Sequence, residues 1–259
     1  MLELPRSDYS NENMDKQMEA PLSRASVQPC VVGSIHTGRS VLQADIMLVE
    51  YGGKRYALKD FRLRPRVVRL LFGRRVIAHE FRIMKQLEGI EGIPRVVGMV
   101  DGDGFLMEYV EGHRLPSLKE NDLVPEFFER LEHLMRAMHA RGVGHGDLRR
   151  KNVLVTREFQ PYLVDFATAF RVRGHGNLLS RWILAKYRRI DEATLLKLKR
   201  HFMPQHVTPE EVLRLRERPW YLDVGRFLRK NVYRGVVKPR RWKKRWRRWR
   251  EKLFGRAKG

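Results

Sequence analysis

One segment of eight residues constrains the fold of this chain more than any other. It reads HGDLRRKN over residues 145–152 and is followed at once by an apolar run over residues 153–155. A second apolar run, residues 162–164, leads directly into Asp165-Phe166-Ala167. The two runs predict a small β-hairpin. Polar side chains of the kinds that bind metal ions or move protons therefore stand immediately before and immediately after this hairpin.

The residues upstream predict a strand-rich lobe that contains one helix. Apolar β-type runs surround Tyr51-Gly52-Gly53-Lys54, which predicts a hairpin turn. Residues 74–89 carry apolar side chains at steps of four, three and three, which is typical of a helix. Two short strands are expected around residues 96–100 and 105–109, followed by a connector near residues 108–112.

The second half of the chain is expected to be mostly helical. Apolar residues between Phe127 and Met138 mark the buried face of one helix. A further helix is expected to start near Asp191. Residues 208–211, with the sequence TPEE, have the form of a capping box at the start of another helix.

Four motifs, taken in their order along the chain, resemble those of the protein-kinase-like superfamily. Residues 145–152 are similar to the catalytic loop H-x-D-x-x-x-x-N, and residues 165–167 to D-F-G with alanine in place of glycine. Upstream, YALK over residues 56–59 resembles V-A-I-K, and Glu80 lies on the next predicted helix. The resemblance implies an α+β, bilobal fold with a small antiparallel-sheet N-lobe and a truncated helical C-lobe.

The same resemblance implies ATP and Mg²⁺ as cofactors and assigns roles to the motif residues. Lys59 is expected to hold the nucleotide phosphates and to pair with Glu80. Asn152 and Asp165 are expected to bind Mg²⁺, which prefers hard oxygen ligands. Asp147 is expected to orient the acceptor hydroxyl and take its proton. Taken singly, a lysine at a strand end or a glutamate on a helix is usually a solvated surface residue.

Other parts of the expected site depart from the family pattern. Only Gly33 and Gly38 remain of the glycine-rich loop that covers the phosphates, and Glu108 and Val110 in the connector are expected to contact the nucleotide. Ala167 places a flipping activation loop in doubt, because glycine alone tolerates positive φ at no cost. No A-P-E motif follows Asp165. His145 is expected to pack behind the catalytic loop, and loop residue His175 is a weaker candidate for substrate contact.

The chain divides into four expected segments. They are a flexible leader (residues 1–26), the N-lobe (27–109), the C-lobe (110–235) and a basic amphipathic tail (236–259). The single cysteine, Cys30, excludes an intramolecular disulfide and a cysteine-rich zinc site, and it favours a reducing compartment. No pair of the nine histidines has a metal-ligand spacing such as HExxH.

Two further segments suggest a subfamily. Residues 71–81 and 87–94 resemble bacterial lipopolysaccharide core kinases, which act on Kdo or heptose, and their RIO-like relatives. The resemblance covers about residues 30–235. The first group implies a sugar hydroxyl acceptor at the cytoplasmic face of the inner membrane. The second implies a protein acceptor or an ATPase.

The formal charge of +23 suggests an anionic partner. Residues 238–252 hold ten Lys or Arg and one Glu, and Trp242, Trp246 and Trp249 share one helical face. This segregation favours an anionic membrane surface. Nucleic acid binding and simple packing remain open. A second basic stretch, residues 61–76, has six Arg and no acid; it either binds substrate anions or is a solvated insertion with its apolar side buried.

The sequence therefore favours an ATP-dependent phosphotransferase attached peripherally to the cytoplasmic face of the inner membrane, with a glycolipid sugar hydroxyl as acceptor. One alternative is a RIO-like serine/threonine protein kinase or ATPase with an RNA-binding tail. The other is a membrane-bound pseudokinase scaffold, which the intact Asp147, Asn152 and Asp165 argue against.

Overall fold

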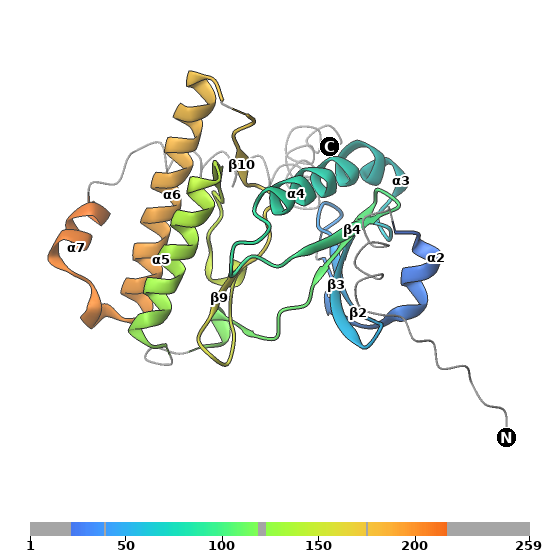
Figure 1. Cartoon of the computed structure of the whole chain (residues 1–259), viewed down its shortest axis with the longest axis horizontal. Helices are drawn as coiled ribbons and strands as arrows, with labels where there is room; N and C mark the ends of the chain where they lie inside the picture. The colour runs from blue at the N-terminus through green and yellow to red at the C-terminus, as the bar shows by residue number, and fades with distance from the viewer. Residues whose placement is uncertain (1–21, 39, 119–122, 175, 217–259) are drawn as a thin grey trace, which may run out of the picture.

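A five-stranded antiparallel sheet forms the first lobe of the computed structural model, which describes residues 22–38, 40–118, 123–174 and 176–216 (Figure 1). Every neighbouring pair of strands in this sheet is antiparallel, as the predicted N-lobe requires. In spatial order, the strands are β1 (Val31–His36), β2 (Asp45–Tyr51), β3 (Lys54–Asp60), β5 (Gly104–Glu108) and β4 (Val96–Val100).

The turn between β2 and β3 is the two-residue hairpin that the sequence predicts. Gly52 and Gly53 both have positive φ, at 56° and 71°. A type I′ turn needs positive φ at both central positions, which glycine adopts without a steric penalty. Tyr51 pairs with Lys54 on either side of this turn, so the turn fixes the register between β2 and β3.

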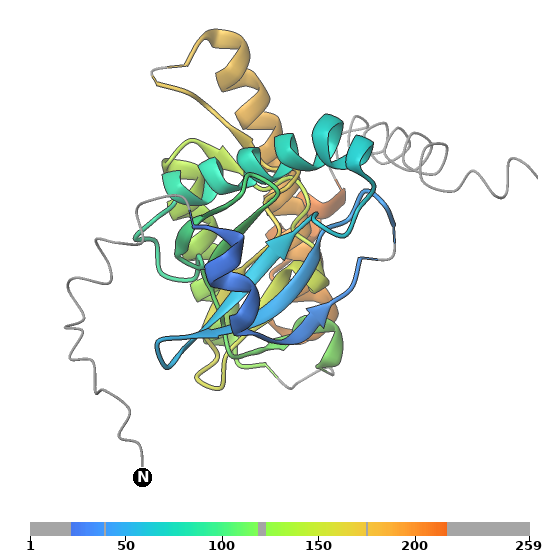
Figure 2. The same ribbon diagram turned by 90° about the vertical axis from the view of Figure 1, so that its right-hand side faces the viewer.

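One face of the sheet is covered by the short helix α2 (Arg24–Val27) (Figure 2). Val27 is buried with Val49 and Leu58 on this face. Arg24 donates two hydrogen bonds to Asp60, at 2.7 and 3.0 Å. Residues 22–26 fall within the segment expected to be a flexible leader. They are instead held against the sheet, because Arg24 pairs with the buried carboxylate of Asp60 on β3.

The opposite face packs against helix α4 (Arg74–Gln86) and the second lobe. Alternation along the strands separates the two faces, so Leu58 lies under α2 while Ala57 and Phe105 belong to the larger core. Ile77 and Met84 of α4 are buried in that core. The predicted helix is present, but helical backbone already begins at Arg66, in α3 (Arg66–Val68) and the π-helical turn η2 (Arg69–Gly73), and α4 ends at Gln86 before the expected residue 89.

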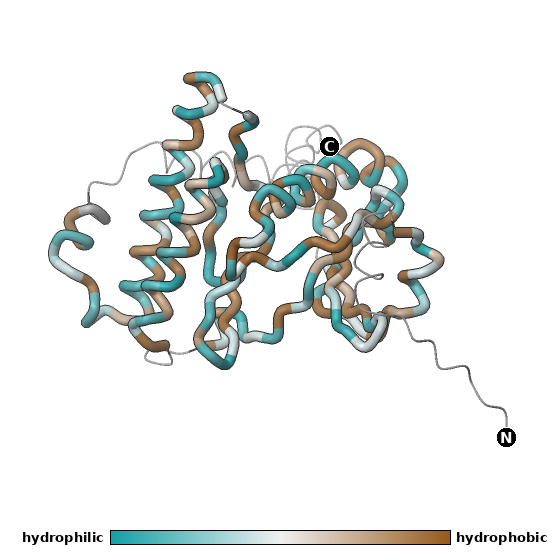
Figure 3. The backbone as a smooth tube through the Cα atoms, in the orientation of Figure 1, coloured by the Kyte–Doolittle hydropathy of each residue, from teal (hydrophilic) through white to brown (hydrophobic). Residues whose placement is uncertain are grey.

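The second lobe is small and mainly helical, which confirms the predicted fold class. Its long helices α5 and α6 lie side by side, with polar and apolar residues alternating along both (Figures 1 and 3). The predicted hairpin is present as β8 and β9. The elements are β6 (His113–Arg114), η3 (Leu115–Ser117), α5 (Pro125–Ala140), β7 (Val143–Gly144), η4 (Arg150–Asn152), β8 (Val153–Val155), β9 (Pro161–Leu163), β10 (Phe170–Arg171), α6 (Leu178–Phe202), η5 (Pro204–His206) and α7 (Pro209–Arg216).

Both predicted helix starts in this lobe can be compared with the structure. The capping box is present: the Glu211 N–H donates to Thr208 Oγ1 at 3.2 Å, and the Thr208 N–H donates to Glu211 Oε2 at 2.8 Å. The helix start near Asp191 was wrong. That helix begins at Leu178, where Asn177 Oδ1 accepts from the Ser180 N–H at 2.8 Å. Asp191 is a fully buried residue in the middle of α6.

Gly92 joins the two lobes at a close backbone contact. Its carbonyl accepts from the Leu163 N–H of β9 at 2.8 Å, and its φ is +90°. A Cβ at this position would lie 2.6 Å from Pro161 O and 2.6 Å from a methyl carbon of Leu134. Positive φ and close backbone contact therefore both require glycine here.

We expect Gly92→Ala to destabilise the protein more than Gly89→Ala. Both glycines have positive φ, so both variants carry a backbone strain of about 1–2 kcal/mol. Only Gly92→Ala adds the clash with Pro161 and Leu134, which raises the total to roughly 3 kcal/mol. Urea denaturation of the two variants and the wild type measures the difference. Equal free energies of unfolding for both variants would contradict this account of the lobe contact.

No helix within the described residues has both the length and the apolar composition needed to cross a bilayer. Trp242, Trp246 and Trp249 lie outside those residues, as does His175.

Candidate active site

A buried lysine lies at the centre of the contact between the lobes. Lys59, on β3, is almost fully buried. Its Nζ donates to Glu80 Oε1 of α4 at 2.7 Å and to Asp165 Oδ1 at 3.1 Å. A buried ammonium is costly unless it is paired, and here it has two carboxylates. The structure thus brings together three of the side chains that the motifs single out.

Burial and charge act in opposite directions on this cluster. Burial alone would lower the pKa of Lys59, but the carboxylates of Asp165 and Glu80 outweigh it and raise that pKa above its usual value. Lys59 lowers the pKa of Asp165 to about 2, against a smaller opposing effect of burial. Lys59 is therefore a permanent cation and Asp165 a permanent anion at neutral pH.

Asp165 also has an unusual backbone. Its φ is +69°, which non-glycine residues rarely adopt. The next residue, Phe166, donates its N–H to Glu80 Oε1 at 3.0 Å and is fully buried. Strain of this kind persists where the surroundings hold it, and such places are often functional sites. The Asp165 turn is thus tied to Glu80 through both Lys59 and Phe166.

The catalytic-loop residues are arranged around the β8–β9 hairpin. Asn152 is buried, and its Nδ2 donates to the Asp147 carbonyl at 2.9 Å. The Val164 N–H donates to the Asn152 carbonyl at 3.0 Å, so Asn152 lies at the same end of the hairpin as Asp165. His145 is fully buried and its ring lies 4.8 Å from that of Phe166, in the packing position that the sequence predicts.

Two residues that sequence reasoning missed hold this loop in place. Arg149 forms an ion pair with the Asp147 carboxylate. Asp191 of α6 accepts from the N–H groups of His145 and Gly146, each at 2.8 Å, and contacts His139 Nε2 at 3.0 Å. The only sequence signal for Asp191 was an acidic residue amid the apolar positions of a long helix.

The oxygen donors at this end of the β8–β9 hairpin suit a magnesium ion. Asp165 offers a carboxylate and Asn152 a carboxamide, both hard ligands. Among the described residues, no three His, Cys, Asp or Glu side chains gather into a metal site of their own. A cation bound here would take its remaining ligands from phosphate oxygens and water, which is the usual arrangement for Mg²⁺ beside a nucleotide.

The residues expected to bind the rest of a nucleotide are placed less distinctively. Gly33 lies on β1 with open space around it. The Gly38 N–H donates to Asp45 Oδ1 at 2.8 Å, so this amide is already used within the chain. Glu108 ends β5, and its N–H donates to the Arg95 carbonyl at 2.8 Å. Val110 lies in the irregular connector that follows.

The segment after Asp165 is short. Helix α6 begins at Leu178, only thirteen positions beyond Asp165, with the two-residue strand β10 between them. Ala167 is not among the described non-glycine residues with positive φ, so this turn does not require glycine at that position. The departure from D-F-G therefore causes no backbone strain here.

The basic stretch at residues 61–76 only partly matches the expected insertion with a buried apolar side. Val67 and Leu71 are 66% and 64% exposed. Several arginines are used inside the protein: Arg69 and Arg74 donate to buried Asp103 at 2.8 and 2.9 Å. Arg64 pairs with Asp45 beside the Gly38 loop. The apolar side is thus exposed rather than tucked in, while much of the charge is neutralised.

The RIO domain family model matches residues 51–184, just over half of the chain and all four motifs. This chain belongs to the RIO-domain family. Its fold is similar to the crystal structure of the Rio2 kinase from Chaetomium thermophilum, with a TM-score of 0.51 and 18% identity over 72% of this chain and 63% of that one. At this identity the likeness concerns the fold alone.

Curated relatives match over stretches of 82 to 136 residues. A probable casein kinase I homolog of Encephalitozoon cuniculi is 32% identical over 136 residues, which is 48% of this chain and 41% of that protein. The serine/threonine-protein kinase cds1 of Schizosaccharomyces pombe is 35% identical over 82 residues, 29% of this chain and 18% of that protein. The chain thus spans less than half the length of these relatives. The comparisons indicate no acceptor.

We expect Asp191→Ala to destabilise the RIO domain strongly, while Glu192→Ala does not. The first change leaves three buried donors without their carboxylate, at a cost of roughly 3 kcal/mol or more. Glu192 is its exposed neighbour on α6, where substitutions usually cost less than about 0.5 kcal/mol. Chemical denaturation measures both. Similar stabilities for the two variants would refute the anchoring role of Asp191.

The Asp165 carboxyl should stay ionised well below its ordinary pKa of 3.8. Because its folded pKa is lowered to about 2, its contribution to stability is fully present above about pH 4 and is lost as the pH falls toward 2. The ¹³C chemical shift of the carboxyl reports its charge directly. In Lys59→Met, with its fold checked by near-UV circular dichroism, the midpoint should rise. A wild-type midpoint near 4 would contradict the pairing.

Proposed function

We propose that this protein is a RIO-type phosphotransferase that uses ATP and Mg²⁺ to phosphorylate a hydroxyl group. The observation that carries the proposal is the buried cluster in which Lys59 bonds both Glu80 and Asp165. Phosphoryl transfer depends on positioning and charge neutralisation more than on covalent chemistry. A fixed cation beside oxygen ligands for a metal, next to a loop carrying Asp147, meets that need.

When bound, ATP with Mg²⁺ supplies the transferable phosphoryl group and neutralises part of its charge. Lys59 stabilises negative charge on the phosphates, and Glu80 keeps its ammonium directed from β3. Asp165 and Asn152 would hold the metal. Asp147 orients the acceptor hydroxyl and accepts its proton. For this role its carboxylate must contact the hydroxyl in place of Arg149.

The variants of this proposal differ in the group that accepts the phosphate. A protein hydroxyl, as in serine/threonine kinases, is favoured because the chain belongs to the RIO family and its curated relatives are named as such kinases. ATP hydrolysis is the variant of this proposal in which water replaces the hydroxyl. A sugar hydroxyl of a lipopolysaccharide-type glycolipid, with attachment to the inner membrane, rests on the basic tail over residues 238–252, which lies outside the described residues.

A pseudokinase scaffold is less consistent with the observed geometry. The ion pair between Lys59 and Glu80 is formed at 2.7 Å, and Asp165 points its carboxylate at the same ammonium. Ala167 introduces no positive φ that alanine would resist. The remaining argument for a scaffold is the glycine loop, where one of the two amides is already bonded to Asp45.

We expect Asp147→Asn to abolish phosphate transfer from radiolabelled ATP with Mg²⁺. Loss of a positioned proton acceptor lowers the rate by about 100-fold or more. The assay offers a general protein acceptor, an inner-core glycolipid or water alone, and counts label in each product. The control is Asp101→Asn, the same chemical change at an exposed aspartate in the turn between β4 and β5.

The products separate the candidates. Label on protein that disappears in Asp147→Asn but not in Asp101→Asn supports the protein kinase. Label on the glycolipid alone moves the conclusion to the sugar acceptor, and Asp147-dependent free phosphate moves it to an ATPase. Equal transfer by Asp147→Asn and wild type would contradict the role given to Asp147, and no transfer or hydrolysis by either would contradict a phosphotransferase and leave the scaffold.

A further inference from the structure

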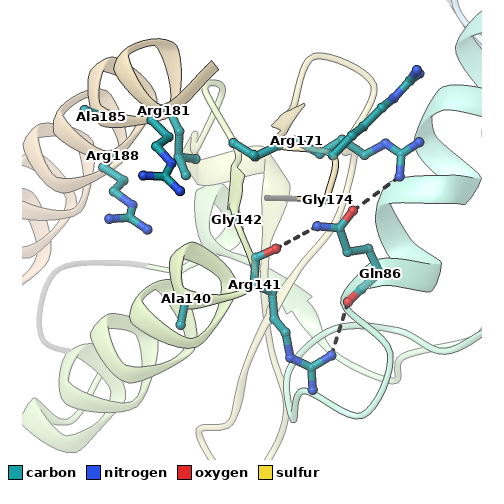
Figure 4. A pocket seen from close by; sticks show the side chains of 12 residues that line it. Gln86, Ala140, Arg141, Gly142, Arg171, Gly174, Arg181, Ala185 and Arg188 are labelled. Atoms are coloured by element: carbon teal, nitrogen blue, oxygen red, sulfur yellow. Dashed lines mark hydrogen bonds between the residues drawn. The ribbon is translucent and has the colours of Figure 1, made fainter. Parts of the chain in front are cut away.

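One cavity that borders the C-lobe carries an unusual concentration of positive charge. It has a volume of about 730 Å³ and lies between the end of α4, the end of α5, β10 with the residues after it, and the first half of α6 (Figure 4). None of the described residues that line it is Asp or Glu. Its five arginines are Arg141, Arg171, Arg173, Arg181 and Arg188.

One face of α6 supplies the wall on one side. Arg181, Leu184, Ala185 and Arg188 all line the cavity. Their spacing of three, one and three residues is that of a single helical face. Arg181 and Arg188 are thus two turns apart on the same side of α6. Figure 4 shows both on the α6 side of the cavity, while the side chains of Arg171 and Arg141 on the other side run toward Gln86.

Neutral groups hold the opposite wall in position. Arg171 Nη1 donates to Gln86 Oε1 at 3.3 Å, and Gln86 Nε2 donates to the Arg141 carbonyl at 2.7 Å (Figure 4). Arg141 Nη1 in turn donates to the Gln86 carbonyl at 3.2 Å. On the α6 side, Arg188 likewise donates to a neutral group, the His139 carbonyl, at 2.6 Å. Amide and carbonyl oxygens orient a guanidinium without cancelling its charge.

A neighbouring cavity shows that the positive charge of the chain does not gather equally in every cavity. That cavity, of about 650 Å³, lies between α5, α6 and α7. Its basic residues are accompanied by glutamates, so its charge is balanced within the chain. The charged residues are Glu129, Glu132, Arg136, Arg189, Glu192, Lys199 and Glu211. The arginine cavity is of similar size and has no such compensation in its lining.

The cations of the arginine cavity also act on one another. Burial, together with the neighbouring charges of Arg173 and Arg82, lowers the pKa of Arg171 below its usual value. Holding like charges together is unfavourable, and a bound anion would relieve it. The guanidinium group suits this role, because its planar fork matches phosphate oxygens with two parallel hydrogen bonds.

We propose that the arginine cavity binds a compact ligand carrying two or more phosphate groups, separately from the site around Lys59. A volume of about 730 Å³ is in the range of small-molecule sites and exceeds what one phosphate needs. Arg141, Arg171 and Arg188 bond neutral oxygens that leave their charge in place, so more than one negative charge is needed to balance them. Lys59, Asp147, Asn152 and Asp165 do not line this cavity, so the proposal does not rest on the proposed activity.

The position of the cavity connects it to the catalytic loop. Arg171 on β10 pairs with Val143 on β7, and Phe170 pairs with Gly144, directly before His145. The Val172 N–H donates to the Gly142 carbonyl at 2.9 Å. A ligand that bridges α6 and β10 would therefore steady the β7–β10 pair. Strand β7 directly precedes the loop with Asp147, and β10 follows Asp165.

The test measures binding of tripolyphosphate by calorimetry, without metal and at 150 mM salt. We expect one molecule to bind the wild-type protein and Arg171→Gln/Arg173→Gln to bind at least tenfold more weakly. Arg171→Lys/Arg173→Lys should keep most of the affinity, because it keeps the charge. The matched control is Arg157→Gln/Arg200→Gln, which removes two exposed arginines elsewhere and should change the affinity less than twofold.

The outcomes are decisive in both directions. If the glutamine pair at 171 and 173 binds like wild type while its melting temperature is also unchanged, the cavity is not the site and the proposal fails. The proposal also fails if all variants weaken equally, since that is general attraction to a basic protein. Because ATP transfer is measured separately, inactivity of the enzyme would not mimic either result.

A second arm identifies the source of the phosphates. Vesicles of neutral lipid containing a phosphomonoester lipid are offered in place of tripolyphosphate. Vesicle binding that depends on Arg171 and Arg173, with weak tripolyphosphate binding, assigns the site to a lipid headgroup. Tripolyphosphate binding alone assigns it to a soluble ligand. Single-stranded RNA that binds through these arginines while both compact probes fail would overturn the proposal.

Discussion

The buried charge of Lys59 is the constraint on which the arrangement of the two lobes depends. An ammonium group on the central strand of the sheet can stay inside the protein only if carboxylates accompany it. One of them, Glu80, comes from α4, and the other, Asp165, comes from the C-lobe. The Glu80 carboxylate also accepts the Phe166 N–H, so the same cluster positions the strained Asp165 turn. Fold and candidate chemistry thus share one set of contacts.

Asp191 has a similar part within the C-lobe. It is fully buried on α6 and gathers the backbone of the catalytic loop and the ring of His139 around one carboxylate. The lobe has few helices and a short segment between Asp165 and α6, so α6 can reach the loop directly. Gly144 and Gly146 pack against Tyr187 of the same helix: an added Cβ would lie 2.4 Å from Tyr187 Cβ at the first position and 2.4 Å from its ring carbon Cε1 at the second.

The large positive charge of the chain is distributed unequally. In the N-lobe, Asp45, Asp60 and Asp103 are buried and each is paired with arginine, so part of the charge holds the fold together. In the arginine cavity, Arg141 and Arg171 donate to neutral oxygens of Gln86. The first group is structural, and the second is arranged as a recognition site for anions.

Local features of this protein could be predicted from its sequence alone. The glycine turn, the capping box, the β8–β9 hairpin and the order of the kinase-like motifs each depend on residues close together in the chain. Contacts across long separations could not: Lys59 meets Asp165 across 106 positions, and Asp191 looked like a helix start because its partners lie on other elements. The arginine cavity draws on four segments that only packing brings together. Tertiary structure decided these features, because they arise from distances in space that no local pattern encodes.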